Sequence, residues 1–414
     1  MDVSLVLAFG GLLIVATLLS ERARTTVLST SVLFVVGGLL LGSGWLPWAR
    51  IEPSGAVLAE IAKIALFTVL IVDGAELDVR AIANAWKLPG RALLLGLPLT
   101  IAAIALAAHL LLDTGWRVSV LLGAVLSPTD PVMIRTILAH GAVPLRLRRL
   151  LSIESGLNDG LALPPIVLLL AMLGDPAAHP LAALAEGGAG IAVGVIVALV
   201  ALLDRTRWAS LSTAYQPLLG VGIAVSVFAI CDLTDANELL AAFAAGVTLA
   251  TARGNLAKSF RSVGEPLSEA VKLGTLLVFG ATLSLDLDVP ALVFAAIVLI
   301  AARPTAILLA FLGNGLPRHE WVVAAWFGPK GFASLLYASL VLASGIPRAA
   351  ELYKVVGLVV VVSIVVHSST DSLVARMFAS RQKAKEADDG GDDHAATVGR
   401  NAPAAPEAQK SRPT

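Results

Sequence analysis

Charge is scarce in this chain of 414 residues, of which only 14% are Asp, Glu, Lys or Arg, where a soluble domain carries roughly 25%. This shortage excludes a water-soluble globule. The single cysteine, Cys231, excludes an intramolecular disulfide and a multi-cysteine zinc or iron-sulfur site. The six histidines show no metal-ligand spacing such as HExxH, and no nucleotide-binding GxxxxGKS/T motif occurs. The 30 basic residues balance the 30 acidic ones, so net charge points to no nucleic-acid partner.

Hydrophobic residues, in contrast, make up 57% of the chain, and glycine (36) and proline (21) are frequent, as they are in membrane-spanning helices. Apolar stretches of about 20 residues, the length that a bilayer requires, number about thirteen. They are centred near residues 11, 35, 64, 101, 127, 162, 195, 222, 245, 275, 301, 332 and 364. The sequence therefore predicts an all-α polytopic membrane protein with about 13 transmembrane helices over residues 1–378, the first of them a retained span rather than a signal peptide.

The basic residues of short loops favour the cytoplasmic side of a membrane. Here they concentrate in one set of alternate loops and in the C-terminal segment, while the other set holds Arg50, Arg117, Arg348 and Lys354. This bias predicts a multi-pass protein of a bacterial-type cell inner membrane, with the N-terminus outside and the C-terminus in the cytoplasm. Residues 379–414 are rich in Ala, Pro, Asp and Lys without hydrophobic periodicity, which predicts a disordered cytoplasmic tail.

Two of the expected spans carry helix-breaking residues at mid-depth. The fifth contains Ser127-Pro-Thr-Asp-Pro131, and the twelfth contains Gly328-Pro-Lys-Gly331. Proline lacks an amide hydrogen and crowds the preceding turn, which frees backbone carbonyls that lipid cannot satisfy but an ion can. Two such breaks, seven spans apart, predict inverted repeats of about residues 3–173 and 211–378, with two crossed broken helices and a binding site at the membrane midplane.

Each break also carries one charged residue, Asp130 in the fifth span and Lys330 in the twelfth. Opposed half-helices bring their positive N-terminal ends together and their negative C-terminal ends together, so these two side chains are suited to neutralise the two groups of helix ends. Each is either a structural cap of a helix dipole or, in addition, part of an ion site.

The sixth span opens with Glu154-Ser-Gly-Leu-Asn-Asp-Gly160. Carboxylates inside a membrane cost roughly 2.5 to 3.5 kcal/mol each, and they usually mark a functional site. At helical spacing Ser155 and Asp159 share one face, while Glu154 and Asn158 share a neighbouring one. We expect a dehydrated sodium ion to be held by Asp159, Asp130, Ser155 and the region of Thr129, with Glu154 paired to Lys330. The alternative is a buried hydrogen-bond network that only fixes helix packing.

At these residues the sequence resembles the bacterial NhaP-type sodium/proton antiporters of the monovalent cation/proton antiporter-1 family. The matching stretches are Ser127 to Val132, Glu154 to Gly160, Leu240 to Gly246 and Trp326 to Tyr337. The resemblance implies the NhaA-like fold, a mobile core domain, a dimerisation domain and a homodimer. It also implies an ion-site pair, Asn158-Asp159, of the kind found in electroneutral members. One departure is Lys330, where such proteins usually carry arginine.

The mechanism that we expect is an exchange of a monovalent cation, Na⁺ before Li⁺ or K⁺, for H⁺ by alternating access. Burial disfavours the charged form of a carboxylate, so the cation and the proton would compete for Asp159. The alternatives are a sodium-coupled solute symporter and a cation channel of related architecture. An enzyme is not expected, and neither is a cofactor, since Na⁺ and H⁺ are the transported substrates.

Seven further residues have less certain roles. Asp73, with Glu76 and Asp78, is expected in the loop after the third span, because charges gather at the ends of spans. Arg303 is expected either to snorkel to the interface or to contact the broken helices. His367 is expected to pack, with a proton relay as the alternative. Asn237 and Glu238 are expected to start a helix near the outer face, with an access path as the alternative.

Overall fold

The computed structural model describes residues 3–23, 30–42, 55–77, 82, 86–130, 137–138, 140–174, 180–203, 212, 214–282 and 288–398. Within these ranges the chain is all helical, without a strand. The helices are α1 (Val3–Ala23), α2 (Thr30–Gly42), α3 (Gly55–Glu76), α5 (Lys87–Arg91), η1 (Ala92–Gly96), α6 (Leu97–Leu111), α7 (Trp116–Leu126), α9 (Leu145–Gly174), α10 (Pro180–Leu202), α12 (Gln216–Thr234), α13 (Glu238–Ala252), α14 (Gly254–Thr282), α15 (Val289–Ile297), η3 (Val298–Ala302), α16 (Arg303–Ala310), α17 (Arg318–Trp326), α18 (Phe332–Ala343) and α19 (Ala349–Val398).

Large apolar side chains cover the outside of the helical body. Leu7, Leu18 and Leu181 are each more than two-thirds exposed, at 71%, 78% and 77%. Exposed leucines of this number suit a lipid surround rather than water. Among the described residues, six helices are long and apolar enough to cross a membrane, and five shorter apolar helices accompany them. The prediction of an all-α multi-pass membrane protein is confirmed, whereas the number of crossings stays a prediction.

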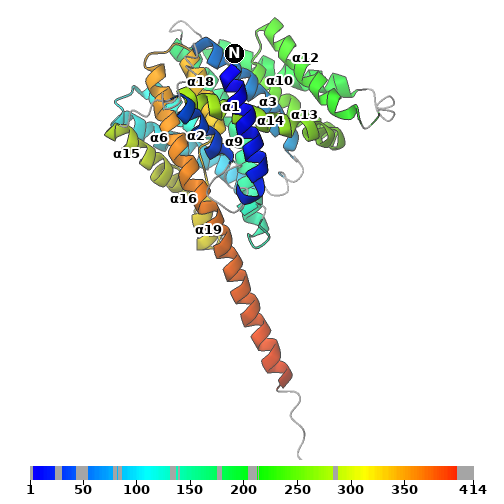
Figure 1. Cartoon of the computed structure of the whole chain (residues 1–414), viewed down its shortest axis with the longest axis vertical. Helices are drawn as coiled ribbons and strands as arrows, with labels where there is room; N and C mark the ends of the chain where they lie inside the picture. Colours follow the sequence, from blue (N-terminus) through cyan, green and yellow to red (C-terminus); the bar gives the residue numbers. More distant parts are fainter. Residues whose placement is uncertain are drawn as a thin grey trace, which may run out of the picture.

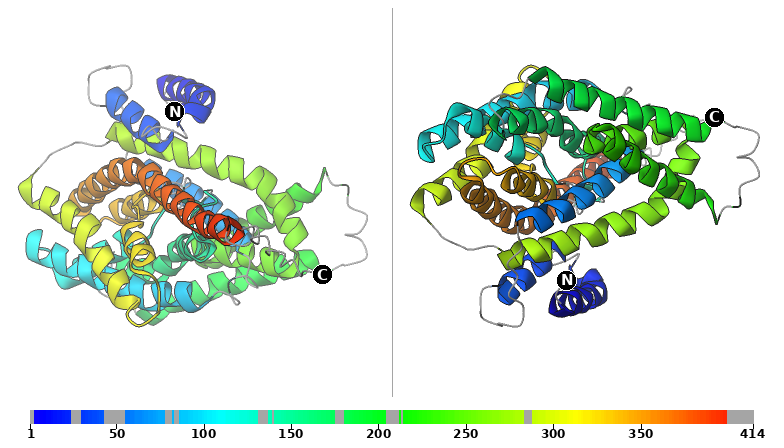
Figure 2. Two further views of the ribbon diagram at one scale, coloured as in Figure 1. Left: turned by 90° about the horizontal axis from the view of Figure 1, so that it is seen from below. Right: turned by 90° about the horizontal axis from the view of Figure 1, so that it is seen from above.

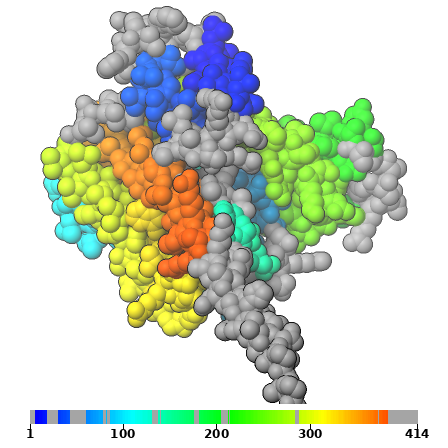
Figure 3. All heavy atoms as spheres, turned by 60° about the horizontal axis from the view of Figure 1, so that its bottom comes forward, coloured from blue at the N-terminus to red at the C-terminus, as the bar shows by residue number. Residues whose placement is uncertain are grey.

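The helices form two groups that meet around α3 and α9. In the first group α14 packs along α2, α3 and α12, and α13 packs between α3 and α10. In the second group α6 packs on α7, α16 on α17, and α18 on α19. Figure 2 shows α1 and α2 on the outer side of α14, and Figure 3 shows the green helices of the first group protruding beside the yellow and orange helices of the second. The predicted ion site lies where the groups meet, because α18 and α9 both contact α3.

Two spans contain one turn of π-helix directly before a proline. The turn η1 precedes Pro98 at the start of α6, and η3 precedes Pro304 at the start of α16. Proline cannot donate the regular helical hydrogen bond, so the bonding pattern shifts by one residue at this point. The shift in the second span brings Arg303 to the first position of α16, where its side chain enters the protein interior.

The C-terminal helix α19 is longer than the sequence predicts. It runs from Ala349 to Val398 and projects from the helical body as one rod (Figure 1). The segment from residue 379 to residue 398 is thus helical, where composition predicts disorder. Alanine, lysine, glutamate and arginine, which are strong helix formers, make up most of residues 379–387, whereas helix propensity does not explain why the helix continues through Gly390 and Gly391. The remaining predicted tail lies outside the described residues.

Candidate functional site

The two interrupted spans meet at their breaks. Helix α7 ends at Leu126, and the chain continues in a non-helical conformation through Asp130; α17 ends at Trp326, and α18 begins at Phe332. The backbone N–H of Asp130 donates to the carbonyl oxygen of Pro329 at 2.9 Å, which joins one break to the other. Pro131, at the far side of the first break, lies outside the described residues.

Asp130 and Lys330 each lie at a helix end of the other broken span. The Asp130 carboxylate accepts a hydrogen bond from the backbone N–H of Phe332, in the first turn of α18, with Oδ2 to N at 3.3 Å. The Lys330 ammonium donates to the carbonyl oxygens of Ser127 and Pro128, just after α7, at 3.1 and 3.4 Å. A negative group near a helix N-terminus and a positive group near a C-terminus both offset the helix dipole. This is the arrangement that opposed half-helices predict.

Two glycines leave the space that the second break needs. A Cβ atom at Gly328 would collide with the guanidinium of Arg303, and one at Gly331 would collide with the carboxylate of Asp130. Any larger residue at either position would displace a charged side chain. The Gly-Pro-Lys-Gly sequence therefore follows from two charged neighbours that approach its backbone.

Three of the predicted site residues, Thr129, Ser155 and Asn158, are joined by hydrogen bonds, and Asp159 follows Asn158 on α9. The Asn158 amide donates from Nδ2 to the hydroxyl of Thr129 at 2.6 Å, and the hydroxyls of Thr129 and Ser155 lie 3.1 Å apart. Asp159 is on the same helix, and the Tyr337 hydroxyl donates to its backbone carbonyl at 2.7 Å. All of these side chains are buried. We refer to Thr129, Ser155, Asn158 and Asp159 as the polar cluster.

The polar cluster contains two acceptor oxygens without a donor. Asn158 Oδ1 and Asp159 Oδ1 are both buried and have no hydrogen-bond partner among the residues that the structure describes. Buried polar atoms are nearly always satisfied in folded proteins, so these two oxygens are open to a water molecule, a proton or a cation. Oxygen ligands of this type suit a hard cation or a proton. Among the described residues no group of three His, Cys, Asp or Glu side chains forms a metal site, and the cluster relies on hydroxyl and amide oxygens instead.

Glu154 does not pair with Lys330, so that prediction is wrong. Its carboxylate forms an ion pair with Arg303, with Oε1 to Nη1 at 2.8 Å, and both side chains are 5% exposed. The Arg303 guanidinium also donates to the carbonyl oxygen of Phe327 at 3.1 Å. Arg303 therefore contacts the second broken helix, which is one of the two roles expected for it. Through Glu154 it also links this broken helix to α9.

His367 holds the second break from the other side. Its ring nitrogens contact the backbone oxygen of Trp326 at 3.2 Å and the hydroxyl of Ser363 at 3.2 Å. The Ser363 hydroxyl in turn accepts the backbone N–H of Lys330 at 2.6 Å. These contacts fix the ring against the second break, which suits a packing role.

Two charged residues near the polar cluster were missed as site residues. Helix α3 continues through Asp73 to Glu76, so the prediction that these residues lie in a loop is wrong, and Asp78 lies outside the described residues. Asp73 and Lys272, the latter on α14, both interact electrostatically with Asp159. The Lys272 ammonium also lies 5.9 Å from the centre of the Phe332 ring. A carboxylate inside the apolar run Leu70-Ile-Val-Asp73-Gly was the available signal.

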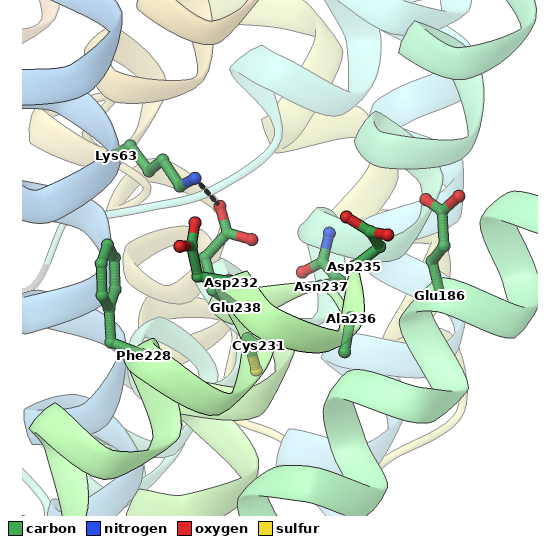
Figure 4. Close-up of a pocket in the computed structure, with 9 residues that line it drawn as sticks. All are labelled: Lys63, Glu186, Phe228, Cys231, Asp232, Asp235, Ala236, Asn237 and Glu238. Atoms are coloured by element: carbon green, nitrogen blue, oxygen red, sulfur yellow. Dashed lines mark ion pairs between the residues drawn. The ribbon is translucent and has the colours of Figure 1, made fainter.

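A separate pocket of about 510 Å³ lies near Asn237 and Glu238 (Figure 4). Asn237 is the N-cap of α13 and accepts the N–H of Leu240 at 2.9 Å, which confirms the predicted helix start. Glu238 forms an ion pair with Lys63 at 3.0 Å. The pocket is also lined by Glu186, Asp232 and Asp235, and we call it the acidic pocket. It contains none of the predicted ion-site residues.

Comparison with known proteins places the chain in a family. The family described as "Sodium/hydrogen exchanger, transmembrane" matches residues 9–376. The chain belongs to this family. The K(+)/H(+) antiporter NhaP of Alkalimonas amylolytica is 27% identical to this exchanger-family chain over 378 residues, which are 88% of the chain and 64% of that relative. The K(+)/H(+) antiporter NhaP2 of Shewanella oneidensis is 24% identical over 377 residues, which are 88% of the chain and 65% of the relative.

Solved structures show the same fold. The sodium proton antiporter MjNhaP1 of Methanocaldococcus jannaschii at pH 8 superimposes with a TM-score of 0.69 at 18% identity, over 91% of this exchanger-family chain and 99% of that one. A second structure of MjNhaP1, from electron microscopy, gives a TM-score of 0.72 at 19% identity. The predicted NhaA-like fold with two crossed broken helices is thereby confirmed, while the boundaries of the two repeats stay a prediction.

Proposed function

We propose that the chain is a secondary active antiporter that exchanges a monovalent cation for H⁺ by alternating access. Membership of the exchanger family supports this, although the chain spans only 64% to 65% of the length of the curated relatives cited above. The observation that carries the proposal is the pair of orphaned, buried oxygens in the polar cluster: Asn158 Oδ1, whose amide donates to Thr129, and Asp159 Oδ1 on the next residue of α9.

In this mechanism the cation and the proton are mutually exclusive occupants of the polar cluster. Asp159 takes the proton, or it binds the cation together with Ser155, Thr129 and the nearby Asp130. Either occupant neutralises the carboxylate, and a neutral site crosses the low-dielectric barrier more readily than a charged one. After one ion leaves, the empty site is charged and cannot cross the barrier. The site therefore has to bind the other ion before it crosses, and this couples the two ions in exchange.

The other charged residues keep the site in shape. Glu154 and Arg303 fix α9 against the second broken helix, and Lys330 compensates the helix end after α7. Asp73 approaches from α3, and we assign it to the cation site as an additional acidic group. Glu76 and Arg261, which form an exposed ion pair at 3.4 Å between α3 and α14, mark the access path from the side that we assign to the cytoplasm.

Sodium is the cation that we favour, in agreement with the name of the family and with MjNhaP1. The bacterial relatives named as K(+)/H(+) antiporters make potassium the second candidate. We further propose that the chain forms a homodimer in a bacterial-type inner membrane, with the N-terminus outside. The symporter and channel alternatives lack a supporting observation of their own.

The test is proton movement in everted vesicles, reported by a pH-sensitive dye, on addition of NaCl, KCl or LiCl. Wild-type vesicles should release protons with at least one cation, and Asp159→Asn vesicles should behave like vesicles without the protein. Asp232→Asn, which removes a carboxylate from the acidic pocket, is the matched control and should retain exchange. Cation-driven proton movement in Asp159→Asn would refute the site, and cation current without proton movement would indicate a channel.

A further inference from the structure

A second pocket of about 510 Å³ lies at the ends of three membrane spans, far along the chain from the acidic pocket. Its walls come from the start of α5, the start of α9 and the turn between α16 and α17. Helix α9 carries Asp159, and α16 carries Arg303, so this pocket joins the ends of elements that build the ion site. We call it the basic pocket.

Four cationic side chains line the basic pocket: Lys87, Arg91, Arg146 and Arg149. None of the described residues that line it is acidic. Two of the cationic side chains are fixed by the protein. Arg91 donates to the carbonyl oxygens of Ala310 and Leu312, at 2.8 Å each, after the end of α16. Arg146 donates to both carboxylate oxygens of Glu320 at 2.6 Å. These bonds hold the α16–α17 turn against α5 and α9 and define the shape of the pocket.

The other two cations are available to a ligand. The side chains of Lys87 and Arg149 make no ion pair or hydrogen bond with another residue in the described part of the chain. Asn314 lines the same pocket, and its Oδ1 accepts the N–H of Leu316 at 2.8 Å, which orients the amide. Its Nδ2 is buried and has no acceptor among the described residues. Two cations and an orphaned donor together call for an anionic oxygen ligand.

Exposed apolar side chains adjoin the basic pocket. Trp86, which lines it, is 40% exposed, and Leu145 and Leu312, the sequence neighbours of its walls, are 52% and 56% exposed. Tryptophan favours the headgroup level of a bilayer, and exposed leucines favour acyl chains over water. A soluble anion would contact the cationic side chains but not these exposed apolar side chains. A lipid with an anionic headgroup would contact both.

We propose that the basic pocket binds the phosphate headgroup of an anionic phospholipid, whose acyl chains lie against Trp86, Leu145 and Leu312. Lys87, Arg149 and Asn314 Nδ2 contact the phosphate oxygens, as basic pockets between membrane helices do with anionic headgroups. The bound headgroup then bridges the ends of α5, α9 and the α16–α17 turn.

The proposal can be tested by native mass spectrometry of the purified full chain in detergent, titrated with dioleoylphosphatidylglycerol or dioleoylphosphatidylcholine. The anionic lipid should bind more tightly than the zwitterionic one. The double variant Lys87→Gln/Arg149→Gln should weaken binding of the anionic lipid at least about tenfold, since each basic residue attracts an anionic headgroup separately. Lys258→Gln/Arg376→Gln removes two exposed basic residues outside the pocket, and it should change binding less than about twofold. Equal losses in the two double variants would overturn the proposal.

Two further arms separate lipid from soluble anion and binding from misfolding. Millimolar inorganic phosphate should not displace the bound phosphatidylglycerol, and Trp86→Ala should weaken lipid binding; displacement by phosphate would overturn the lipid assignment. Lys87→Arg/Arg149→Lys keeps both charges and should restore binding to within about threefold of wild type. If this charge-conserving variant binds no better than the glutamine variant, while its thermal transition matches wild type, the proposal fails.

Discussion

Glu154 and Asp159 are two buried carboxylates on one helix, slightly more than one turn apart, and their surroundings differ completely. Glu154 has a dedicated guanidinium, Arg303, at 2.8 Å. Asp159 keeps one buried carboxylate oxygen without a partner among the described residues. The difference indicates that a carboxylate fixed by a neighbouring cation serves the architecture, whereas one with an open oxygen remains available for an exchangeable ligand.

The cause of the difference lies on other helices. The turn of π-helix before Pro304 brings Arg303 into the interior, where it reaches Glu154 and the carbonyl oxygen of Phe327. Tyr337 on α18 donates to the backbone carbonyl of Asp159 and not to its side chain. Helical position alone therefore does not decide the role of a carboxylate on α9.

Removal of the guanidinium should give the largest effect on stability. Arg303→Met leaves Glu154 buried without its cation, which typically costs about 3 to 5 kcal/mol. The expected result is loss of folded protein, measured by thermal unfolding in detergent. The double variant Glu154→Leu/Arg303→Met should recover most of the loss, because apolar replacements of a whole buried pair are often neutral. A double variant as unstable as the single one would contradict the structural role of this pair.

A second carboxylate next to Asp159 should change the net charge that is moved across the membrane for each transported cation. Asn158→Asp adds an acidic group that can take another proton, so each cation would exchange for two protons and transport would become electrogenic. The measurement is membrane potential in proteoliposomes during cation-driven proton movement. Asn237→Asp is the matched control, because aspartate is an equally good N-cap for α13, and it should leave the charge moved per transported cation as in wild type. An electroneutral Asn158→Asp would mean that this position does not share protons with Asp159.

The sequence predicts the breaks in the two spans and the polar cluster, because proline, glycine and intramembrane polar residues are local signals. It does not predict the partner of Glu154, since both Lys330 and Arg303 are distant in sequence, and only the folded geometry shows that Lys330 is occupied by the carbonyl oxygens of Ser127 and Pro128. Asp73 was misplaced because hydropathy does not mark where α3 ends. The sequence does not single out Lys272, because α14 carries several charged residues. Nothing in the sequence shows that it is Lys272 that interacts with Asp159.

Lys272 offers a smaller effect that sharpens the contrast between the two carboxylates. It interacts electrostatically with Asp73, Asp130, Glu269 and Asp159, so we expect it to compete with the transported cation for the polar cluster. Lys272→Gln should lower the half-saturating cation concentration by about tenfold, the equivalent of roughly 1.4 kcal/mol. The measurement is cation-dependent proton release, and Lys258→Gln on the exposed part of α14 is the control. An unchanged or raised half-saturating concentration would exclude competition by Lys272.

The smallest effect is expected for Lys330→Arg. Lys330 is fully buried; its ammonium donates to the carbonyl oxygens after α7, and among the described residues it interacts with Glu154 and Asp159 electrostatically rather than through a direct ion pair. A guanidinium can donate to the same two carbonyl oxygens, so the exchange rate should remain within about threefold of wild type, with allowance for the larger, planar head. Lys330→Met, which removes the donor and the charge, should reduce the rate much more. If the arginine variant instead loses exchange while its thermal stability is retained, the cycle requires either deprotonation of Lys330 or its compact head, and in the first case Lys330 would belong with Asp159 rather than with Glu154.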